Sequence, residues 1–325
     1  MIFYLIGADY KTATFETRES LYIQRKAIAA FWSDTLPRQA AVLITCNRIE
    51  IFALAGGVTE AKERLAQFFK RFPQFLGNSF VIFGYQAVCM HALRLATGLE
   101  SQLQGELQIA GQLDDWYRQE GFPPALKSLI QSALSRGRQI RSRTGLDVSS
   151  NNIATIVYKD IQKRLGDNLQ YNAVILGTGK IAELFSRFHP ENARLIFAAH
   201  RNFSKAQLLA IQVEGQALRL EKISEIIETA DVLISATASP HLVLNFHELA
   251  ALVRQCTKLL YVYDLALPRD IDSRCEGLPG VCLQNLETLR STFETENKRI
   301  KDKINLARYL CEEYAAGYRK MAHVQ

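Results

Sequence analysis

The chain has 325 residues, of which 48% are hydrophobic and 22% are charged. This length exceeds the needs of one ordinary core and the composition excludes a disordered chain, so we expect two folded domains and an appendage. The net charge of +6, from 39 basic and 33 acidic residues, permits a polyanionic partner without requiring one.

Neither the apolar runs nor the amino terminus predicts a membrane segment. The longest apolar runs have the length of strands, far short of a bilayer-spanning helix. Residues 1–7 have no basic start and no small-residue cleavage site, so they predict a first strand instead of a signal peptide. We therefore expect a cytoplasmic protein that does not associate with membranes.

The first part of the chain predicts a small α+β domain. Short apolar, β-rich runs predict strands at Ile2–Ala8 and Ala41–Thr45, with Ile51–Ala55 as a hairpin partner. Val58–Arg71 has the spacing of an amphipathic helix, and Ser79–Tyr85 predicts a fourth strand.

Helical patterns then continue to the end of this domain. They run from Gln86 to Arg143 with a break at Gly121–Pro124, and the polar stretch Gly145–Asn152 predicts a domain boundary. Four arginines without an acid lie just before it, at positions 136, 138, 141 and 143. Phosphate contact and an ordinary solvated helix face are both open interpretations of this cluster.

The second domain predicts a parallel sheet. A helix at Ile153–Arg164 precedes an alternation of helical segments with apolar runs. Such alternation is typical of parallel strands joined by right-handed crossovers and covered by helices on both faces. The predicted strands are Asn172–Leu176, Arg194–Ala199, Asp231–Ser235 and Leu259–Tyr263.

The last segment predicts a long amphipathic helix from Leu286 onward. Its apolar residues recur at steps of three and four, and one polar residue, Asn297, lies among them. The helix either packs on the protein's own domains or links domains or subunits. The apolar positions are Leu289, Phe293, Ile300, Ile304, Ala307, Cys311, Tyr314, Tyr318 and Met321.

A glycine-rich turn predicts a dinucleotide site. After the strand that ends at Leu176, the sequence has the pattern G-x-G-x-x-A. The first glycine permits a tight turn, the second lets backbone N–H groups approach a pyrophosphate, and the alanine keeps the helix close to the sheet. The residues are Gly177, Thr178, Gly179, Lys180, Ile181 and Ala182.

The end of the next strand favours NADP(H) over NAD(H). An NAD site usually has an acidic residue there for the ribose hydroxyls, whereas this chain has His200 and Arg201 followed by further polar residues. We expect Arg201, helped by Ser204 and Lys205, to bind a 2′-phosphate.

Cys46 is the candidate nucleophile. It is one of six cysteines, at positions 46, 89, 256, 275, 282 and 311, and no C-x-x-C pair predicts a zinc or dithiol site. Cys46 follows an apolar run and precedes Arg48, whose guanidinium favours the reactive thiolate. By itself the position also fits a packed core cysteine.

A polar segment of helical pattern, His91–Gln112, strengthens the catalytic interpretation. Ser101, Glu106, Gln108 and Gln112 are hydrogen-bonding groups interleaved with glycines, as expected for recognition of a small polar substrate.

Together, Thr-Cys-Asn-Arg-x-Glu at positions 45–50, the His91 segment and the G-x-G-x-x-A turn resemble the glutamyl-tRNA reductase family, the first enzymes of five-carbon tetrapyrrole synthesis. Lys11–Ala13, Thr237–His241 and Asp264–Asp272 resemble further signatures of that family. The resemblance implies an α/β protein with three parts. These are an α+β catalytic domain at 1–150, a Rossmann-type NADP-binding domain at 151–284 and a spinal helix at 285–325.

The resemblance also implies the chemistry. Cys46 would take the glutamyl group from glutamyl-tRNA(Glu) as a thioester, which NADPH reduces to glutamate-1-semialdehyde, and His91 would be required for activity. Glutamate-1-semialdehyde aminomutase is an implied partner. The positions that match the glutamyl-binding residues are Thr45, Asn47, Arg48, Ser101, Glu106, Leu107, Gln108 and Gln112.

Some positions depart from the family pattern. Leu107 replaces a proline, Tyr10 a histidine, and Lys180–Ala182 a more usual Glu-Met-Gly. The sequence ends at Gln325, where the family continues into a dimerisation domain, so we expect a short form that does not dimerise by that route. Two alternatives are an NADP-dependent, shikimate dehydrogenase-like enzyme of a small acid and a non-catalytic regulatory paralogue.

Overall fold

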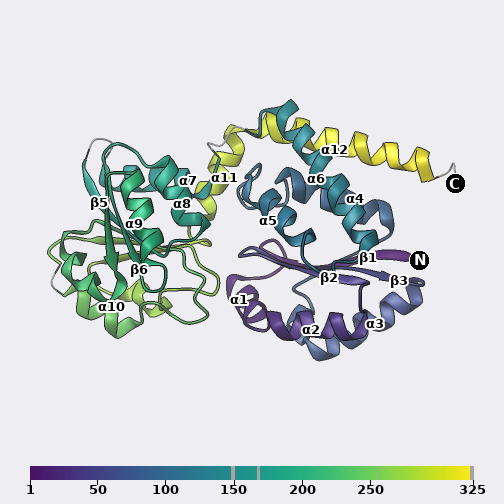
Figure 1. Ribbon diagram of the computed structural model, residues 1–325, viewed down its shortest axis with the longest axis horizontal. Coiled ribbons are helices and arrows are strands. Elements are labelled where there is room, and N and C mark those ends of the chain that lie inside the picture. The colour runs from purple at the N-terminus through teal and green to yellow at the C-terminus, as the bar shows by residue number, and fades with distance from the viewer. Residues whose placement is uncertain (148–150, 167–168, 255, 323–325) are drawn as a thin grey trace. The chain divides into compact units, whose positions relative to one another are not determined.

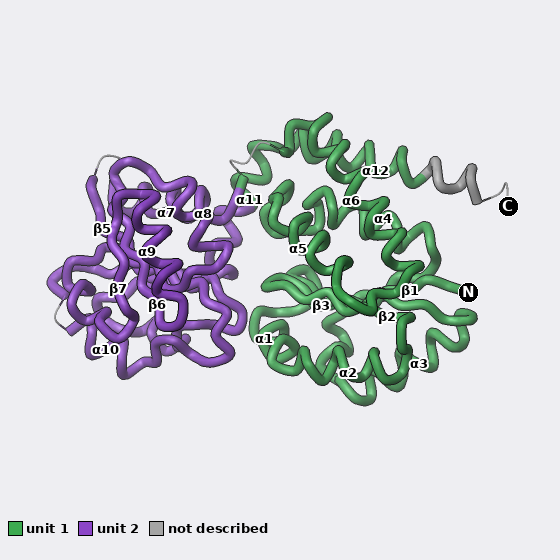
Figure 2. The backbone as a smooth tube through the Cα atoms, in the orientation of Figure 1, with its two compact units in different colours: residues 1–151, 294–325 green, residues 152–293 purple. Residues whose placement is uncertain are grey.

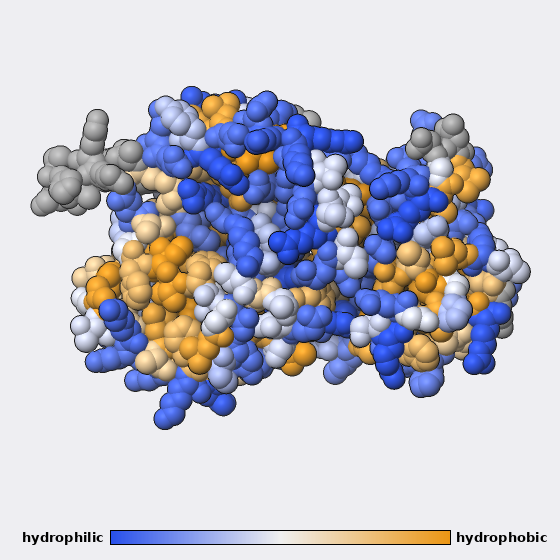
Figure 3. Space-filling view, turned by 180° about the vertical axis from the view of Figure 1, so that it is seen from behind, coloured by the Kyte–Doolittle hydropathy of each residue, from blue (hydrophilic) through white to orange (hydrophobic). Residues whose placement is uncertain are grey.

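The computed structural model describes residues 1–147, 151–166, 169–254 and 256–322, with side chains up to residue 315. The chain forms two compact units, Met1–Asn151 with Glu294–Gln325, and Asn152–Phe293 (Figure 2). Part of the predicted boundary at Gly145–Asn152 lies outside the described residues. None of the helices in the described part of the chain combines the length and the hydrophobicity that a membrane-spanning helix requires. On the face drawn in Figure 3, hydrophobic and hydrophilic side chains are interspersed.

The first unit is built on a four-stranded antiparallel sheet. Its strand order is β2-β3-β1-β4, with Ile2 opposite Ala55 and Asp9 opposite Arg48 in the central pair. The predicted hairpin partner thus begins earlier than expected, at Arg48. The strands are β1 (Ile2–Asp9), β2 (Ala40–Ile44), β3 (Arg48–Ala55) and β4 (Phe80–Phe83).

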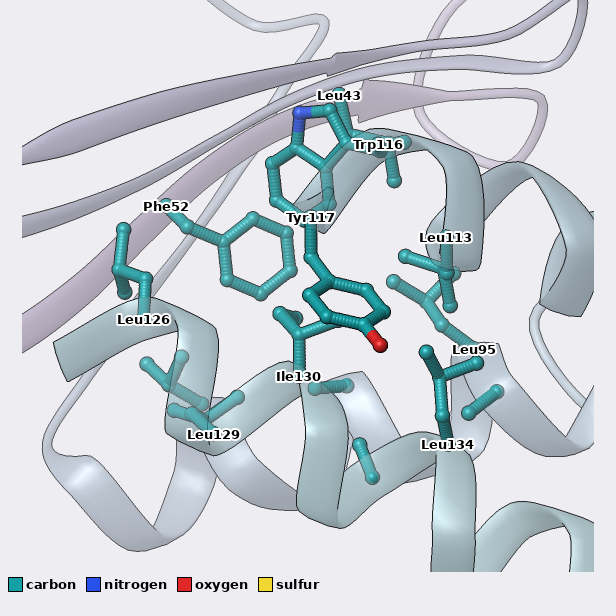
Figure 4. Close-up of a cluster of buried hydrophobic side chains, with 14 of the residues drawn as sticks. Leu43, Phe52, Leu95, Leu113, Trp116, Tyr117, Leu126, Leu129, Ile130 and Leu134 are labelled. Atoms are coloured by element: carbon teal, nitrogen blue, oxygen red, sulfur yellow. The ribbon is translucent and has the colours of Figure 1, made fainter. Parts of the chain in front are cut away.

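Helices cover both faces of this sheet (Figure 1). Trp32 and Phe68 pack with Ile51 on one face, whereas Trp116 and Ile130 pack with Phe52 on the other (Figure 4). Neighbouring residues of β3 face opposite sides because side chains alternate along a strand. The helices on the first face are α1 (Phe15–Ile23), α2 (Arg25–Thr35) and α3 (Val58–Arg71), which leads into the 3-10 turn η1 (Pro73–Phe75). Those on the second face are α4 (Tyr85–Thr97), α5 (Gln108–Tyr117) and α6 (Pro124–Thr144).

The carboxyl-terminal segment forms two helices instead of the single helix predicted. They are α11 (Arg290–Arg299) and α12 (Lys301–Ala322), separated by a turn at Ile300. Ile304, Ala307 and Cys311 pack against α4 and α6 of the same unit, which confirms that the apolar positions face the protein's own core. The side chains of Tyr318 and Met321 lie outside the described residues.

The second unit is a six-stranded parallel sheet of order β10-β9-β8-β5-β6-β7. After β5 the chain adds β6 and β7 on one side, and then returns to add β8, β9 and β10 on the other side. The point between β5 and β8 is the switch point at which dinucleotides bind in such folds. Four strands match the prediction, and the edge strands β7 and β10 were not predicted. The strands are β5 (Tyr171–Leu176), β6 (Ala193–Ala199), β7 (Gln216–Arg219), β8 (Val232–Ser235), β9 (Leu260–Asp264) and β10 (Val281–Asn285).

Both faces of this sheet are covered, as predicted. Leu249 and Val253 pack on one face with Val262, whereas Tyr263, the next residue, donates its hydroxyl to Asp160 on the other. The first face carries α10 (Phe246–Val253) and the second carries α7 (Ile153–Leu165), against which α8 (Lys180–Phe188) packs. The remaining elements are α9 (Phe203–Gln212), η2 (Leu220–Glu225), η3 (Ile227–Thr229) and η4 (Ser273–Gly277).

Candidate active site

Cys46 lies in the tight hairpin between β2 and β3. The amide of Thr45 donates to the Arg48 carbonyl at 2.9 Å, and the amide of Asn47 donates to the Thr45 hydroxyl at 3.2 Å. The buried guanidinium of Arg18 on α1 donates to the Asn47 side chain at 3.4 Å. This turn leaves Cys46 partly exposed and free of a disulfide. Cys46 follows the end of β2, which agrees with its predicted place after an apolar strand.

Behind the hairpin, a buried carboxylate joins two of the predicted site residues. Arg48 and Glu50 are two positions apart on β3, so both point to the face covered by α4. Glu50 accepts a hydrogen bond from the Arg48 guanidinium at 2.9 Å, and its other oxygen lies 3.0 Å from Nε2 of His91. All three side chains are buried.

Gly7 provides the space that Glu50 occupies. It lies opposite Glu50 in the β1–β3 pair, and a Cβ atom there would come within 2.9 Å of Cγ of Glu50 and 2.6 Å of the Phe80 ring. Any larger residue at this strand position would displace the carboxylate.

The charges around Glu50 keep it ionised. Burial opposes ionisation, but His91 and Arg48 outweigh it through their charges and hydrogen bonds and lower the pKa of Glu50 to about 2. For Arg48, burial also opposes the charged form, and Glu50 raises the pKa of the guanidinium above its usual value. The pair is therefore a buried ion pair that persists at neutral pH.

Arg48 favours the thiolate form of Cys46, as predicted, but the other surroundings of Cys46 favour the thiol more strongly. Burial raises its pKa to about 11, and the negative charge of Glu106 adds to the effect. The charge of Arg18 opposes both effects, and the charge of Arg48 opposes them to a smaller extent. A partner must therefore favour the thiolate before Cys46 can react.

The polar segment His91–Gln112 is not one helix, because α4 ends at Thr97 and α5 begins at Gln108. Gly98 ends α4 with a φ of 83°, and a Cβ atom there would lie 2.8 Å from the Glu106 carbonyl. The loop 98–107 therefore folds back on its own start, and Gly105 donates its amide to the Gly98 carbonyl at 3.0 Å.

This loop presents several of the predicted substrate-binding groups. Ser101 is buried and hydrogen-bonds to Glu106, and burial raises the pKa of that carboxyl. Leu107 is exposed, and Gln108 and Gln112 lie half-buried on the first turns of α5. The side-chain amide nitrogen of Gln108 is buried and has no hydrogen-bond partner among the described residues, so it is available to a ligand acceptor.

Arg48 and two residues outside the predicted set, Lys11 and Tyr10, hold the loop in place. Arg48 donates to the Glu100 carbonyl, Lys11 forms an ion pair with the Glu100 carboxylate, and the hydroxyl of Tyr10 donates to the Ser101 carbonyl at 3.2 Å. Tyr10 thus takes a structural part at the position where it departs from the family pattern. The structure brings together Cys46, Arg48, His91, Ser101 and Glu106.

The predicted nucleotide-binding turn lies in the second unit, between β5 and α8. Gly177 has a φ of 102°, and a Cβ atom there would lie 3.2 Å from the Thr237 methyl group, so only glycine fits. The next three positions are Thr178, Gly179 and Lys180, of which Gly179 is the N-cap of α8, and a Cβ atom there would lie 4.0 Å from the Ala236 carbonyl. Ile181 is half-buried and Ala182 is fully buried, both on the first turn of α8. These features fit a pyrophosphate at the helix amino terminus.

Three polar residues at the end of β6 fit the phosphate of NADP(H). Arg201 is exposed and forms no ion pair or hydrogen bond with another described residue. Ser204 is exposed on the first turn of α9, and Lys205 lies 2.6 Å from Glu183 in an ion pair. No acidic side chain neutralises Arg201 among the described residues.

The four-arginine cluster is only partly available to phosphate. Arg141 is buried and donates to the Ala96 carbonyl, and Arg136 stacks on the Tyr314 ring. Arg138 and Arg143 are exposed. Among the described residues, no group of histidine, cysteine and acidic side chains could hold a metal ion.

Comparison with known proteins agrees with this geometry. Residues 6–144 match the glutamyl-tRNA reductase N-terminal domain, and residues 159–292 match the shikimate / quinate 5-dehydrogenase family. The glutamyl-tRNA reductase of Pelotomaculum thermopropionicum is 28% identical over 100% of this chain and 76% of its own length. That of Chromohalobacter salexigens is 31% identical over 90% of this chain and 72% of its own.

A solved structure shares the fold. The glutamyl-tRNA reductase from Methanopyrus kandleri is 22% identical, with a TM-score of 0.50 over 98% of this chain and 80% of that one. The relatives extend over both units, whereas the dehydrogenase match is confined to the second. The chain belongs to the glutamyl-tRNA reductase family.

Proposed function

We propose that this protein reduces glutamyl-tRNA(Glu) to glutamate-1-semialdehyde with NADPH, the first step of five-carbon tetrapyrrole synthesis, through a thioester on Cys46. The observation that carries the proposal is a free, partly exposed cysteine beside a buried Arg48–Glu50–His91 network. A small-acid dehydrogenase would need no such thiol. A regulatory paralogue that has lost catalysis would have no reason to retain the whole network.

The polar groups match the two charges of a glutamyl group. We assign its ammonium to Glu106 and its side-chain carboxylate to Arg48, which must exchange its hydrogen bond to Glu50 or to the Glu100 carbonyl for one to the substrate. The unpaired amide of Gln108 can donate to a ligand oxygen. The other binding residues in this assignment are Thr45, Asn47, Ser101, Leu107 and Gln112.

Substrate binding also activates the thiol. The charge of Glu106 raises the pKa of Cys46, so pairing Glu106 with the substrate ammonium removes an obstacle to the thiolate. The sulfur then attacks the ester carbonyl carbon. The S–C bond forms, the bond to the tRNA ribose oxygen breaks, and that oxygen takes up the thiol proton. We assign His91, oriented by Glu50, to hold the reacting ester.

The thioester makes the reduction possible because its carbonyl is activated toward hydride, whereas that of a free carboxylate is not. Bound NADPH supplies the hydride. Cys46 is released as the thiolate when hydride adds to the carbonyl carbon and the C–S bond breaks, leaving the aldehyde. We assign the pyrophosphate to residues 177–182 and the 2′-phosphate to Arg201, Ser204 and Lys205.

The finer assignments follow from this activity. We propose that residues 1–150 bind and transfer the glutamyl group, residues 151–284 bind NADPH and residues 285–325 form a spine. We further propose that the protein works in the cytoplasm and hands its reactive aldehyde to glutamate-1-semialdehyde aminomutase. Dimerisation is not part of this proposal.

The test is to trap the glutamyl thioester. Full-length protein is mixed with labelled glutamyl-tRNA without NADPH and quenched in acid, and we expect label on the peptide that contains Cys46. Cys46→Ser should abolish both the label and aldehyde formation while NADPH binding persists. Cys256→Ser, which changes a partly exposed cysteine of the second unit, should retain both. Reductase activity in Cys46→Ser would exclude the thioester route.

A further inference from the structure

Two buried carboxylates organise the loops that follow β8 and β9. Asp270 accepts hydrogen bonds from the Ser235 hydroxyl at 2.7 Å, the Thr237 amide at 2.8 Å and the Thr237 hydroxyl at 2.6 Å. Asp264 accepts from the amides of Asp270 and Ile271, both at 3.0 Å. Asp264 therefore shapes the turn that carries Asp270, and Asp270 in turn fixes Thr237.

This arrangement costs stability. Neither Asp264 nor Asp270 forms an ion pair with a described lysine, arginine or histidine, and Asp270 is fully buried. Burial raises the pKa of both carboxyls, and the charge of Asp270 adds to the effect on Asp264. A buried charge without a counter-ion is unfavourable, so such groups concentrate where function requires them.

The network lies at the switch point of the sheet. Strand β8 is the neighbour of β5, and the two loops at their carboxyl ends touch. A Cβ atom on Gly177 would lie 3.2 Å from the Thr237 methyl group and 3.3 Å from the Ala236 carbonyl. Residues 236–237 thus form the wall beside the phosphate-binding turn, and Asp270 sets the position of that wall.

We propose that Asp270 is a positioning residue for the nicotinamide half of NADPH, acting through Thr237. In a doubly wound sheet, a dinucleotide extends across the switch point with one nucleotide on each side. Arg201 follows β6, so the adenosine half lies on the β6 side of Gly179. The nicotinamide half then lies over the ends of β8 and β9, which Asp270 and Asp264 hold. This inference rests on the proposed use of NADPH.

The role of Asp270 is confined to one half of the cofactor, and this makes it testable. Fluorescence titration of the full-length chain with NADPH is compared with calorimetric titration with 2′,5′-ADP, which has the adenosine and 2′-phosphate but no nicotinamide. In Asp270→Asn the amide nitrogen replaces an acceptor oxygen, so one donor of residues 235–237 loses its partner. We expect the Kd for NADPH to rise about tenfold and that for 2′,5′-ADP to stay within about twofold of the wild-type value.

A matched control lies at the opposite edge of the same sheet. Asp231, just before β8, accepts the Asn172 amide at 2.8 Å and pairs with Lys258. Asp231→Asn therefore removes a loop-holding carboxylate far along the strand from the switch point, and both dissociation constants should be unchanged. If Asp270→Asn does not fold, Thr237→Val removes the hydroxyl that donates to Asp270 and accepts the Ser239 amide, but keeps the methyl group on the side of Gly177. It should weaken the binding of NADPH alone.

The outcomes separate this inference from the proposed function. The role of Asp270 would be overturned if the Kd values for NADPH and 2′,5′-ADP rose equally. It would also be overturned if the Kd for NADPH did not rise in either variant. A wild-type chain that binds NADPH but does not reduce glutamyl-tRNA would contradict the proposed function and leave the binding comparison intact.

Discussion

Replacing Glu50 with glutamine tests whether the buried Arg48–Glu50–His91 network holds the catalytic unit together. The substitution keeps the size of the side chain and removes its charge. Arg48 is 1% exposed, so it would remain buried with only the Glu100 carbonyl and the new amide as partners. Removing one partner of a buried pair costs about 3–5 kcal/mol because the other charge is left uncompensated.

The shift in the pKa of Glu50 gives a similar value for the free energy that its charge contributes. This pKa falls from 4.5 to about 2 on folding, and each step of one in pKa corresponds to ~1.36 kcal/mol. The ionised carboxylate therefore contributes about 3 kcal/mol of stability at neutral pH. Since the folded-state pKa is depressed, this contribution is complete above about pH 5 and is lost as the pH falls from 4.5 toward 2.

The chain is well suited to this measurement. Its two tryptophans, Trp32 and Trp116, are both buried in the first unit, so tryptophan fluorescence during urea unfolding reports on that unit. We expect Glu50→Gln to lower the free energy of unfolding by about 3 kcal/mol at pH 7 and by progressively less toward pH 3. Glu60→Gln changes the partly exposed ion pair with Arg64 and should leave the urea concentration at the midpoint of unfolding nearly unchanged. A Glu50→Gln effect as small as that of Glu60→Gln, or one that does not vary with pH, would refute the reasoning.

Two further predictions concern the choice of cofactor and the reactivity of the Cys46 thiol. Arg201→Ala should raise the KM for NADPH at least tenfold and leave that for NADH nearly unchanged, because only NADPH has the 2′-phosphate; equal losses would contradict the assignment. Because burial raises the pKa of Cys46 to about 11, iodoacetamide labelling of Cys46, followed by mass spectrometry, should be slow at pH 7 and rise about tenfold per pH step up to pH 10. A plateau by pH 8 would show that the free enzyme already holds a thiolate.

The sequence predicted the central strands of both sheets because each is an apolar run buried on both sides. It did not predict the edge strand β7, where Gln216 and Arg219 are exposed at the two ends and the pattern is accordingly polar. It also did not predict α1, where the buried Arg18 replaces an apolar residue on the inward face. The first omission arises because an exposed edge strand lacks an apolar run, and the second because a buried position carries a charged residue.

Glu50 shows what spacing alone could have revealed. The motif at residues 45–50 drew attention to Cys46 and Arg48, and Glu50 was not among the predicted site residues. Yet Arg48 and Glu50 are two residues apart on a strand, which puts both on one face and makes a pair of opposite charges predictable. The contact with His91 was not predictable in this way, because it depends on how α4 packs against the sheet.

Asn297 illustrates how a residue that interrupts a pattern can explain the architecture. The sequence marked it as the polar exception on the apolar face of the last segment. In the structure the side-chain oxygen of Asn297 accepts a hydrogen bond from the backbone amide of Gln104 at 2.9 Å. The side-chain nitrogen of Asn297 donates to the backbone carbonyl of Gln102 at 2.8 Å. Both partners are backbone groups of the loop 98–107, whose identity no side-chain pattern could have shown. A residue that satisfies a loop's backbone from both sides fixes the register of α11 on that loop. Helix α11 therefore packs on the first unit through Asn297 and supports the loop that carries Ser101 and Glu106.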